Sequence, residues 1–97
     1  MLTSKQRAYL RGLANTMEPA FIIGKGGLND NMIADIDAAL EARELVKIKI
    51  LNNSMAEPKE ASLEIADRIG ADVVQVIGGK FVLYKMSKEN PTLALPR

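Results

Sequence analysis

The chain has 97 residues, of which 47% are hydrophobic and 26% are charged, and this composition is typical of a single soluble domain. Cysteine and histidine are absent, which excludes thiolate nucleophiles, Ser-His and Cys-His catalytic pairs, and zinc sites built on nitrogen or sulfur. The formal net charge of +1 does not by itself indicate a polyanionic partner. We therefore expect one domain over residues 1–97 that is not an enzyme, holds no metal and needs no cofactor.

The N-terminal segment predicts an amphipathic helix from about Ser4 to Thr16. Thr3 followed three residues later by Gln6 fits a capping box, and apolar residues then recur at helical spacing up to Met17. The chain does not start with a charged stretch followed by an apolar run, and no apolar run approaches about 18 residues. We therefore expect a cytoplasmic protein with no membrane partner.

A short strand and a second helix are predicted next. Ala20-Phe21-Ile22-Ile23 is an apolar run bounded by Pro19 and a glycine, which is typical of a buried strand. Beyond the glycines, Asn29 is a favourable N-cap, and apolar residues line one face of a helix that we expect to end at Arg43.

The segment from 45 to 51 alternates between apolar and other side chains, which predicts a second strand. Its apolar residues are expected on a core face, whereas Lys47 and Lys49 are expected on an opposite, basic face. A third helix is predicted over residues 58–69, since Pro58 suits a first turn and Gly70 suits the position after the last turn.

Two β-rich runs, residues 73–77 and 81–84, are separated by Gly78-Gly79, which predicts a tight hairpin. The element order is then αβαβαββ. Because the first two strands are joined through a helix, they favour a parallel pair, so the sheet is expected to be mixed. The predicted fold class is α/β of the two-layer α+β type, with a four-stranded mixed sheet packed against helices.

Gly24-Lys25-Gly26-Gly27 joins the first strand to the second helix. A glycine-rich turn in this place exposes backbone N–H groups and lets another backbone approach closely, which suits phosphate binding. A turn that needs a positive φ and nothing more would have the same sequence. The longer nucleotide-binding patterns G-x-x-x-x-G-K-[ST] and G-x-G-x-x-G are not satisfied, whereas the short G-x-x-G matches the backbone clamp of KH-type modules.

Charge is distributed unevenly along the chain. The segment up to the glycines and the segment after residue 80 are rich in lysine and arginine, whereas the second and third helices carry most of the acids. Such a fold could have opposed basic and acidic faces, although an ordinary mixed surface would give the same counts. Phe21 and Phe81 lie in apolar strand runs and are expected in the core, so a nucleic-acid ligand would be recognised by its backbone and shape and not by base stacking.

Short motifs from the first helix to the tail occur in the order of one known family. They are Leu2-Thr3-x-Lys5-Gln6-Arg7, Leu10-x-x-Leu13-Ala14, Ile23-Gly24-Lys25-x-Gly27-Leu28, Glu44-Leu45-Val46-Lys47-Ile48-Lys49, Val74-Gln75-Val76-Ile77-Gly78, Val82-Leu83-Tyr84-Lys85 and Leu95-Pro96. The chain resembles the YhbY-type CRM domain family. The resemblance implies a fold similar to the C-terminal domain of translation initiation factor three, RNA binding, and association with precursors of the large ribosomal subunit.

The resemblance also implies which residues contact RNA. The candidate RNA-binding residues are Gly24, Lys25, Gly26, Gly27, Lys5, Arg7, Arg11, Lys47, Lys49 and Lys85. The glycine turn would contact sugar and phosphate, and the basic residues of the first helix would extend the patch around it. The strand lysines and Lys85 either widen this surface or keep an exposed face soluble. Asn15 and Glu18 replace residues that are often basic in the family, so the approach to the turn is less basic here.

Two other functions remain open from the sequence. The acidic helices or the Leu93-Ala94-Leu95 tail could dock a protein partner, and Leu93 and Leu95 are expected to pack on the domain. A small nucleotide-binding enzyme is suggested only by glycines beside a lysine. Asp37 and Glu41, four residues apart, are expected on a solvated helix face. We favour ribosomal RNA in pre-large-subunit particles as the partner, no small-molecule substrate, and a monomer.

Overall fold

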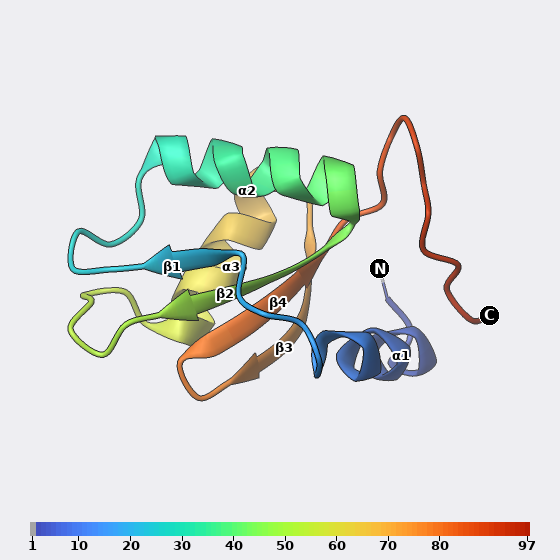
Figure 1. Ribbon diagram of the computed structural model, residues 1–97, viewed down its shortest axis with the longest axis horizontal. Coiled ribbons are helices and arrows are strands. Elements are labelled where there is room, and N and C mark those ends of the chain that lie inside the picture. The colour runs from blue at the N-terminus through green and yellow to red at the C-terminus, as the bar shows by residue number, and fades with distance from the viewer. Residues whose placement is uncertain (1) are drawn as a thin grey trace.

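The computed structural model describes residues 2–97 and has the αβαβαββ order expected from the sequence (Figure 1). The elements are α1 (Ser4–Ala14), β1 (Phe21–Ile23), α2 (Asp30–Arg43), β2 (Leu45–Ile50), α3 (Pro58–Ile69), β3 (Asp72–Ile77) and β4 (Lys80–Tyr84). They form a two-layer α/β fold with a four-stranded mixed sheet, as predicted. Within residues 2–97, no helix is long and apolar enough to cross a membrane.

The predicted capping box of α1 is confirmed. The Thr3 hydroxyl accepts a hydrogen bond from the Gln6 N–H at 3.1 Å, and the Gln6 side chain accepts one from the Thr3 N–H at 3.1 Å. The helix ends at Ala14, earlier than the expected Thr16. The chain turns there because the Met17 N–H donates to the Ala14 carbonyl at 3.0 Å.

Helices α2 and α3 each end at a residue in the left-handed conformation. Asn29 caps the start of α2 by accepting a hydrogen bond from the Met32 N–H at 2.8 Å. Gly70 ends α3 with a φ of 73°, as glycine commonly does. Glu44 ends α2 with a φ of 68°, which is uncommon for glutamate. Its buried side chain accepts hydrogen bonds from the C-terminal tail, residues 85–97, and these contacts offset the cost of the left-handed conformation.

The sheet has the strand order β1-β2-β4-β3. Strands β1 and β2 are parallel, and β4 pairs antiparallel with both β2 and β3. The first strand begins at Phe21 rather than Ala20, although the Ala20 N–H still donates to the Lys47 carbonyl at 2.8 Å. A register shift between Val73 and Gln75 marks an irregularity in β3.

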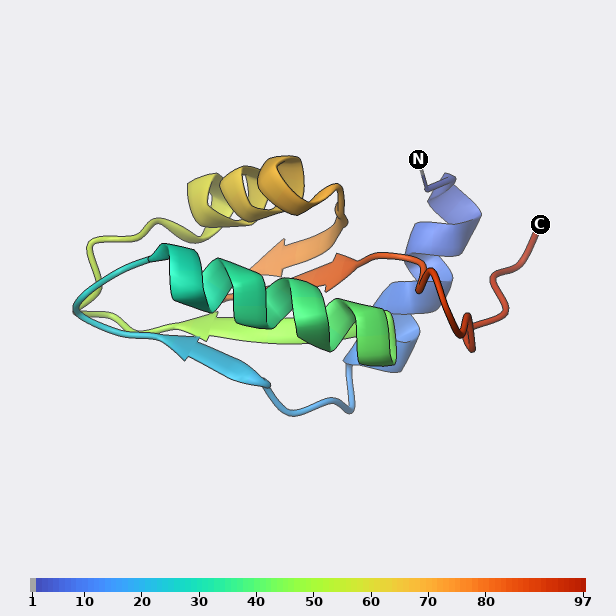
Figure 2. The same cartoon turned by 90° about the horizontal axis from the view of Figure 1, so that it is seen from above.

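Two hydrophobic clusters lie on opposite faces of this sheet. Helices α2 and α3 cover one face (Figures 1 and 2), and their cluster contains Ile23, Ile33, Ile36, Leu40, Val46, Ile48, Ile50, Ala61, Ile65, Ala66, Phe81 and Leu83. The cluster on the other face joins α1 to the sheet and contains Leu2, Leu10, Ala14, Leu45, Val74, Val82 and Tyr84. Leu93 and Leu95 of the tail pack against it, which confirms that the tail docks.

Candidate nucleic-acid interface

The glycine segment forms a tight turn after β1. The Gly27 N–H donates to the Gly24 carbonyl at 3.0 Å, and Gly27 has a φ of 70°, which favours glycine there. The N–H groups of Lys25 and Gly26, at the tip, have no acceptor within residues 2–97. Both tip residues are exposed. Two backbone donors without a partner in the described residues and one ammonium group therefore belong to the same exposed turn, a combination that suits an anionic ligand.

Backbone hydrogen bonds hold this turn on the end of the sheet. The Leu51 N–H donates to the Ile23 carbonyl at 2.9 Å, directly before the turn, and the Ile50 N–H donates to the Gly79 carbonyl at 2.7 Å. The β1–α2, β2–α3 and β3–β4 connections thus gather at one end of the molecule (Figure 1). We call this the turn end.

An acidic pocket borders one side of the turn. It has a volume of about 300 Å³ and is lined by Gly27, Leu28, Met55, Ala56, Glu57, Glu60, Ala61 and Glu64. Its three carboxylates would repel phosphate. The first turn of α2 is also acidic, since Asp30 lies there and pairs with Arg68 at 2.9 Å. The electrostatic environment of the turn is therefore less repulsive to an anion on the side away from α3.

Lys49 and Lys80 lie on that other side of the turn end. Lys49 is exposed and stands opposite Lys80 in the antiparallel pairing of β2 with β4. Lys80 is not among the candidate residues that the sequence motifs indicated. The signal was present, because a hairpin turn at Gly78-Gly79 places Lys80 at the start of its strand and at the same end as the glycine turn.

The basic residues of α1 lie far from the turn, so the expected continuous patch is not formed. Figures 1 and 2 place α1 at the opposite end of the molecule from the β1–α2 connection. Lys5 and Arg11 are exposed there, and the Arg7 Nε donates to the Val73 carbonyl at 3.4 Å. The resemblance implied one patch around the turn, but α1 packs on the opposite sheet face, away from the strand end that carries the turn.

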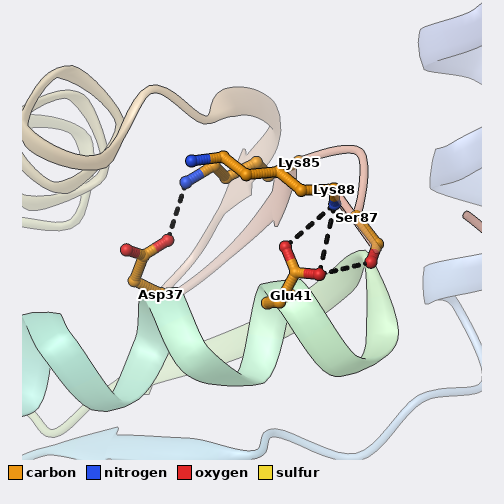
Figure 3. Close-up of polar contacts among 5 residues, drawn as sticks. All are labelled: Asp37, Glu41, Lys85, Ser87 and Lys88. Atoms are coloured by element: carbon orange, nitrogen blue, oxygen red, sulfur yellow. Dashed lines mark hydrogen bonds and ion pairs between the residues drawn. The ribbon is translucent and has the colours of Figure 1, made fainter. Parts of the chain in front are cut away.

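Two other candidate lysines are engaged within the protein. Lys47 lies on the sheet face opposite Val46 and Ile48, as expected, but its ammonium is not exposed to a ligand, because it donates to the carbonyls of Ala14 at 3.1 Å and Met17 at 3.3 Å. It thereby completes the C-terminal end of α1. Lys85 pairs with Asp37 at 2.8 Å, and its side chain is 20% exposed (Figure 3).

Glu41 was expected on a solvated helix face, but its carboxylate instead accepts hydrogen bonds from the start of the C-terminal tail (Figure 3). The Lys88 N–H, the Ser87 hydroxyl and the Glu89 N–H donate to its carboxylate and lower its pKa from 4.5 to about 2. Asp37, one turn earlier, carries the ion pair with Lys85. The shared face of α2 is therefore a docking face for residues 85–89.

Glu44 makes a second set of contacts with the tail. Burial alone would raise the pKa of Glu44, but the N–H groups of Leu93, Ser87 and Thr92 donate to its carboxylate, and the net effect lowers its pKa. The residue is fully buried. No local sequence pattern indicates this role of Glu44, because the donors lie more than forty residues away along the chain.

Comparisons with known proteins show the family of this chain. The CRS1/YhbY (CRM) domain matches residues 2–85. The chain belongs to the CRS1/YhbY (CRM) domain family. This confirms the resemblance drawn from the sequence motifs, and CRM domains are a non-catalytic family.

Whole-length relatives of this CRM domain are named RNA-binding proteins. It is 46% identical over 96 residues to the "Probable RNA-binding protein YqeI" of Bacillus subtilis, covering 99% of this chain and 100% of that protein. It is 34% identical to an "RNA-binding protein" of Haemophilus influenzae, covering 99% and 96% of the two chains. The solution structure of the hypothetical protein SAV1595 from Staphylococcus aureus is also similar, with a TM-score of 0.81 and 48% identity over 99% of this chain and 100% of that one.

Proposed function

We propose that this CRM domain is a monomeric, cytoplasmic protein that binds structured ribosomal RNA and acts in assembly of the large ribosomal subunit. Its whole-length relatives in two bacteria are named RNA-binding proteins, which supports the RNA-binding part of the proposal. The ribosomal partner follows from the family resemblance of the sequence motifs. A catalytic role has no support, since the family is non-catalytic.

The observation that carries this proposal is the pair of unpartnered N–H groups at Lys25 and Gly26. Backbone donors without a partner in the described part of the chain can bind a phosphate oxygen without breaking a hydrogen bond of the protein, and the Lys25 ammonium adds an attractive charge. At Gly26 a Cβ atom would meet nothing within 4 Å, so the protein itself does not need glycine there. Close approach of an RNA backbone would explain why this position has no side chain.

The basic residues of α1 form a separate contact in this proposal. Lys5, Arg7 and Arg11 lie at the end opposite the turn, and the molecule measures 39 × 26 × 21 Å. A folded RNA can present phosphates to both ends at once. Lys47 and Lys85 would have to leave their protein partners to reach RNA, so Lys25 and Lys49 carry most of the charge that we assign to phosphate binding.

Salt-dependent binding tests the proposal. With four to six phosphate contacts, the logarithm of the affinity should fall with the logarithm of salt concentration with a slope of roughly −3 to −5. Lys25→Gln should make this slope less steep by about 0.8 and weaken binding. The control is Arg43→Gln, which removes an exposed charge at the far end of α2 and should leave the slope unchanged. A flat slope for the wild-type protein would contradict RNA binding.

The ribosomal role needs a measurement in cells. Crosslinking followed by mapping of the bound RNA should recover ribosomal RNA of the large subunit, and the protein should sediment with large-subunit precursors. Gly26→Ala should reduce this association without loss of folded protein, because the added methyl group obstructs the RNA and not the chain. Recovery of only messenger or transfer RNA would refute the ribosomal assignment and leave RNA binding intact.

The contacts of the C-terminal tail argue against the alternative function, in which the tail docks a protein partner. The tail is held by Glu41 and Glu44, and Leu93 and Leu95 already pack on the domain. A partner that recognised these leucines would first have to release them. Binding of RNA by a variant that lacks residues 92–97 would separate the two functions, since the tail lies away from the turn (Figure 1).

A further inference from the structure

Four aligned side chains cross the sheet on the face opposite α2 and α3. The strand register places Ile22 of β1 beside Lys49 of β2, and Lys49 opposite Lys80 of β4. Lys80 is in turn opposite Ile77 of β3. We call these four residues the transverse row. Neighbouring strands are about 4.8 Å apart, so the row spans about 14 Å across all four strands.

Two lysines stand directly opposite each other at the centre of the transverse row. Residues opposed in an antiparallel pair have Cβ atoms about 5 Å apart, and like charges in this position destabilise the sheet. Neither Lys49 nor Lys80 forms an ion pair within residues 2–97. A lysine opposite a glutamate would keep the surface just as soluble without the repulsion. The unneutralised pair therefore favours an anionic partner.

Exposed isoleucines occupy both ends of the transverse row. Ile22 is 55% exposed and Ile77 is 61% exposed. A free anion such as phosphate would gain nothing from these side chains. A nucleic-acid strand carries phosphates and also the apolar faces of ribose and base, so it matches a row in which two ammonium groups lie between two apolar side chains.

The two halves of this sheet face differ in what covers them. At the end away from the turn, Leu10 and Ala14 of α1 pack with Leu45 and Val82. At the turn end the same face carries the transverse row, and Ile22 precedes Gly24 by two positions in the chain. An RNA strand that leaves the glycine turn away from the acidic pocket therefore meets the transverse row first.

We infer that the transverse row is a second RNA contact, in which Lys49 and Lys80 bind phosphates of a single-stranded segment while Ile22 and Ile77 contact its ribose and base faces. This inference rests on the proposed RNA-binding function and adds to it a defined surface that lies outside the glycine turn. It assigns a binding role to three residues, Ile22, Ile77 and Lys80, that sequence analysis left without one.

The test compares variants of the full chain with an RNA hairpin that carries a single-stranded extension of uridines. The double variant Lys49→Gln/Lys80→Gln should make the salt slope less steep by about 1.5, the loss expected for two phosphate contacts. It should also melt at the same or a higher temperature, because the like-charge repulsion is gone. Arg43→Gln is the matched control for loss of a surface charge and should change neither value.

A second pair of variants tests the apolar ends of the row. Ile22→Thr and Ile77→Thr keep β-branching, so the strands should persist. Each should weaken binding of the extended hairpin with no change in the salt slope, and should have little effect on a hairpin that lacks the extension.

Three results would count against the inference, and each has a distinct meaning. If the lysine double variant binds the extended hairpin as well as the wild-type protein does, the transverse row is not an RNA contact, and the proposed function still stands. Equal losses for hairpins with and without the extension would overturn the assignment to single-stranded RNA. Failure of the wild-type protein to bind either RNA would overturn the proposed function and this inference together.

Discussion

The carboxylate of Glu44 accepts a hydrogen bond from the Thr92 backbone N–H at 2.6 Å, and this contact joins the end of α2 to the C-terminal tail. The same side chain accepts from Ser87 and Leu93, so one buried charge orders a segment that has no regular secondary structure of its own. Three of the donors are backbone N–H groups and the fourth is the Thr92 hydroxyl, at 3.1 Å, so the arrangement depends on the glutamate more than on the side chains of the tail.

Glu44→Gln should destabilise the protein. An amide presents an NH₂ group to donors that need an acceptor, and each buried donor left unpaired costs about 1–3 kcal/mol. We expect the free energy of unfolding in urea to fall by about 2 kcal/mol. Glu89→Gln, at an exposed tail position, is the control and should change it little. Unaltered stability of the Glu44 variant would mean that the tail contacts contribute nothing to the fold.

Stability should decrease in acid because of the two tail-binding carboxylates. The pKa of Glu41 is about 2 in the folded protein and 4.5 in its ordinary state, and the pKa of Glu44 is also lowered. A lowered folded pKa stabilises the protein above the unfolded pKa, and this contribution is lost as pH falls from about 4.5 through about 2. Urea midpoints measured across this range should decline, and Glu41→Gln should flatten the decline. An equally steep profile in that variant would rule out Glu41 as a cause.

Alanine substitutions in the glycine turn should separate folding from binding. Gly26→Ala has room for its methyl group and no positive φ, so its melting temperature should match the wild-type value. Gly27→Ala places a side chain at a φ of 70° and should cost about 1 kcal/mol of stability. Thermal unfolding monitored by circular dichroism would distinguish the two. Gly12→Ala also meets nothing within 4 Å but lies inside α1, so it should raise the melting temperature, because alanine favours a helix over glycine by about 1 kcal/mol.

Lys47→Met should lower the free energy of unfolding but leave the salt slope of RNA binding unchanged. Its ammonium satisfies the carbonyls of Ala14 and Met17, so we expect a loss of about 1 kcal/mol in urea denaturation. Lys25→Met should instead make the salt slope less steep and leave the free energy of unfolding unchanged, because Lys25 is exposed and makes no ion pair within residues 2–97. A reduced salt slope for the Lys47 variant would show that Lys47 reaches phosphate after all.

Local sequence patterns predicted most of the fold. Local features set the helix ends: the capping box at Thr3 and Gln6, the N-cap at Asn29 and the glycine at position 70. Each affects only residues a few positions away, so its effect could be inferred from spacing in the sequence. The mixed sheet followed from the helix that joins the first two strands and from the hairpin at Gly78-Gly79. These features need no knowledge of which distant segments meet.

The arrangement of the basic residues could not be predicted in the same way. Lys5 and Lys25 are only twenty positions apart, yet α1 packs against β2 and β3 at the end of the molecule opposite the β1–α2 connection that contains Lys25 (Figure 1). Lys49 and Lys80 are farther apart in sequence and stand opposite each other. Lys47 alternates with its neighbours as a solvent-facing strand residue would, and only the position of α1 shows where its ammonium goes.

Fastening of the tail to α2 also determines the direction in which the polypeptide would continue. The final residues run past α1, and the C-terminus lies at the end of the molecule away from the glycine turn (Figures 1 and 2). An affinity tag, a fluorophore or a fused protein attached after Arg97 would thus emerge far from Lys25 and leave the turn unobstructed. Immobilising the protein through this terminus would orient the turn outward toward RNA in solution.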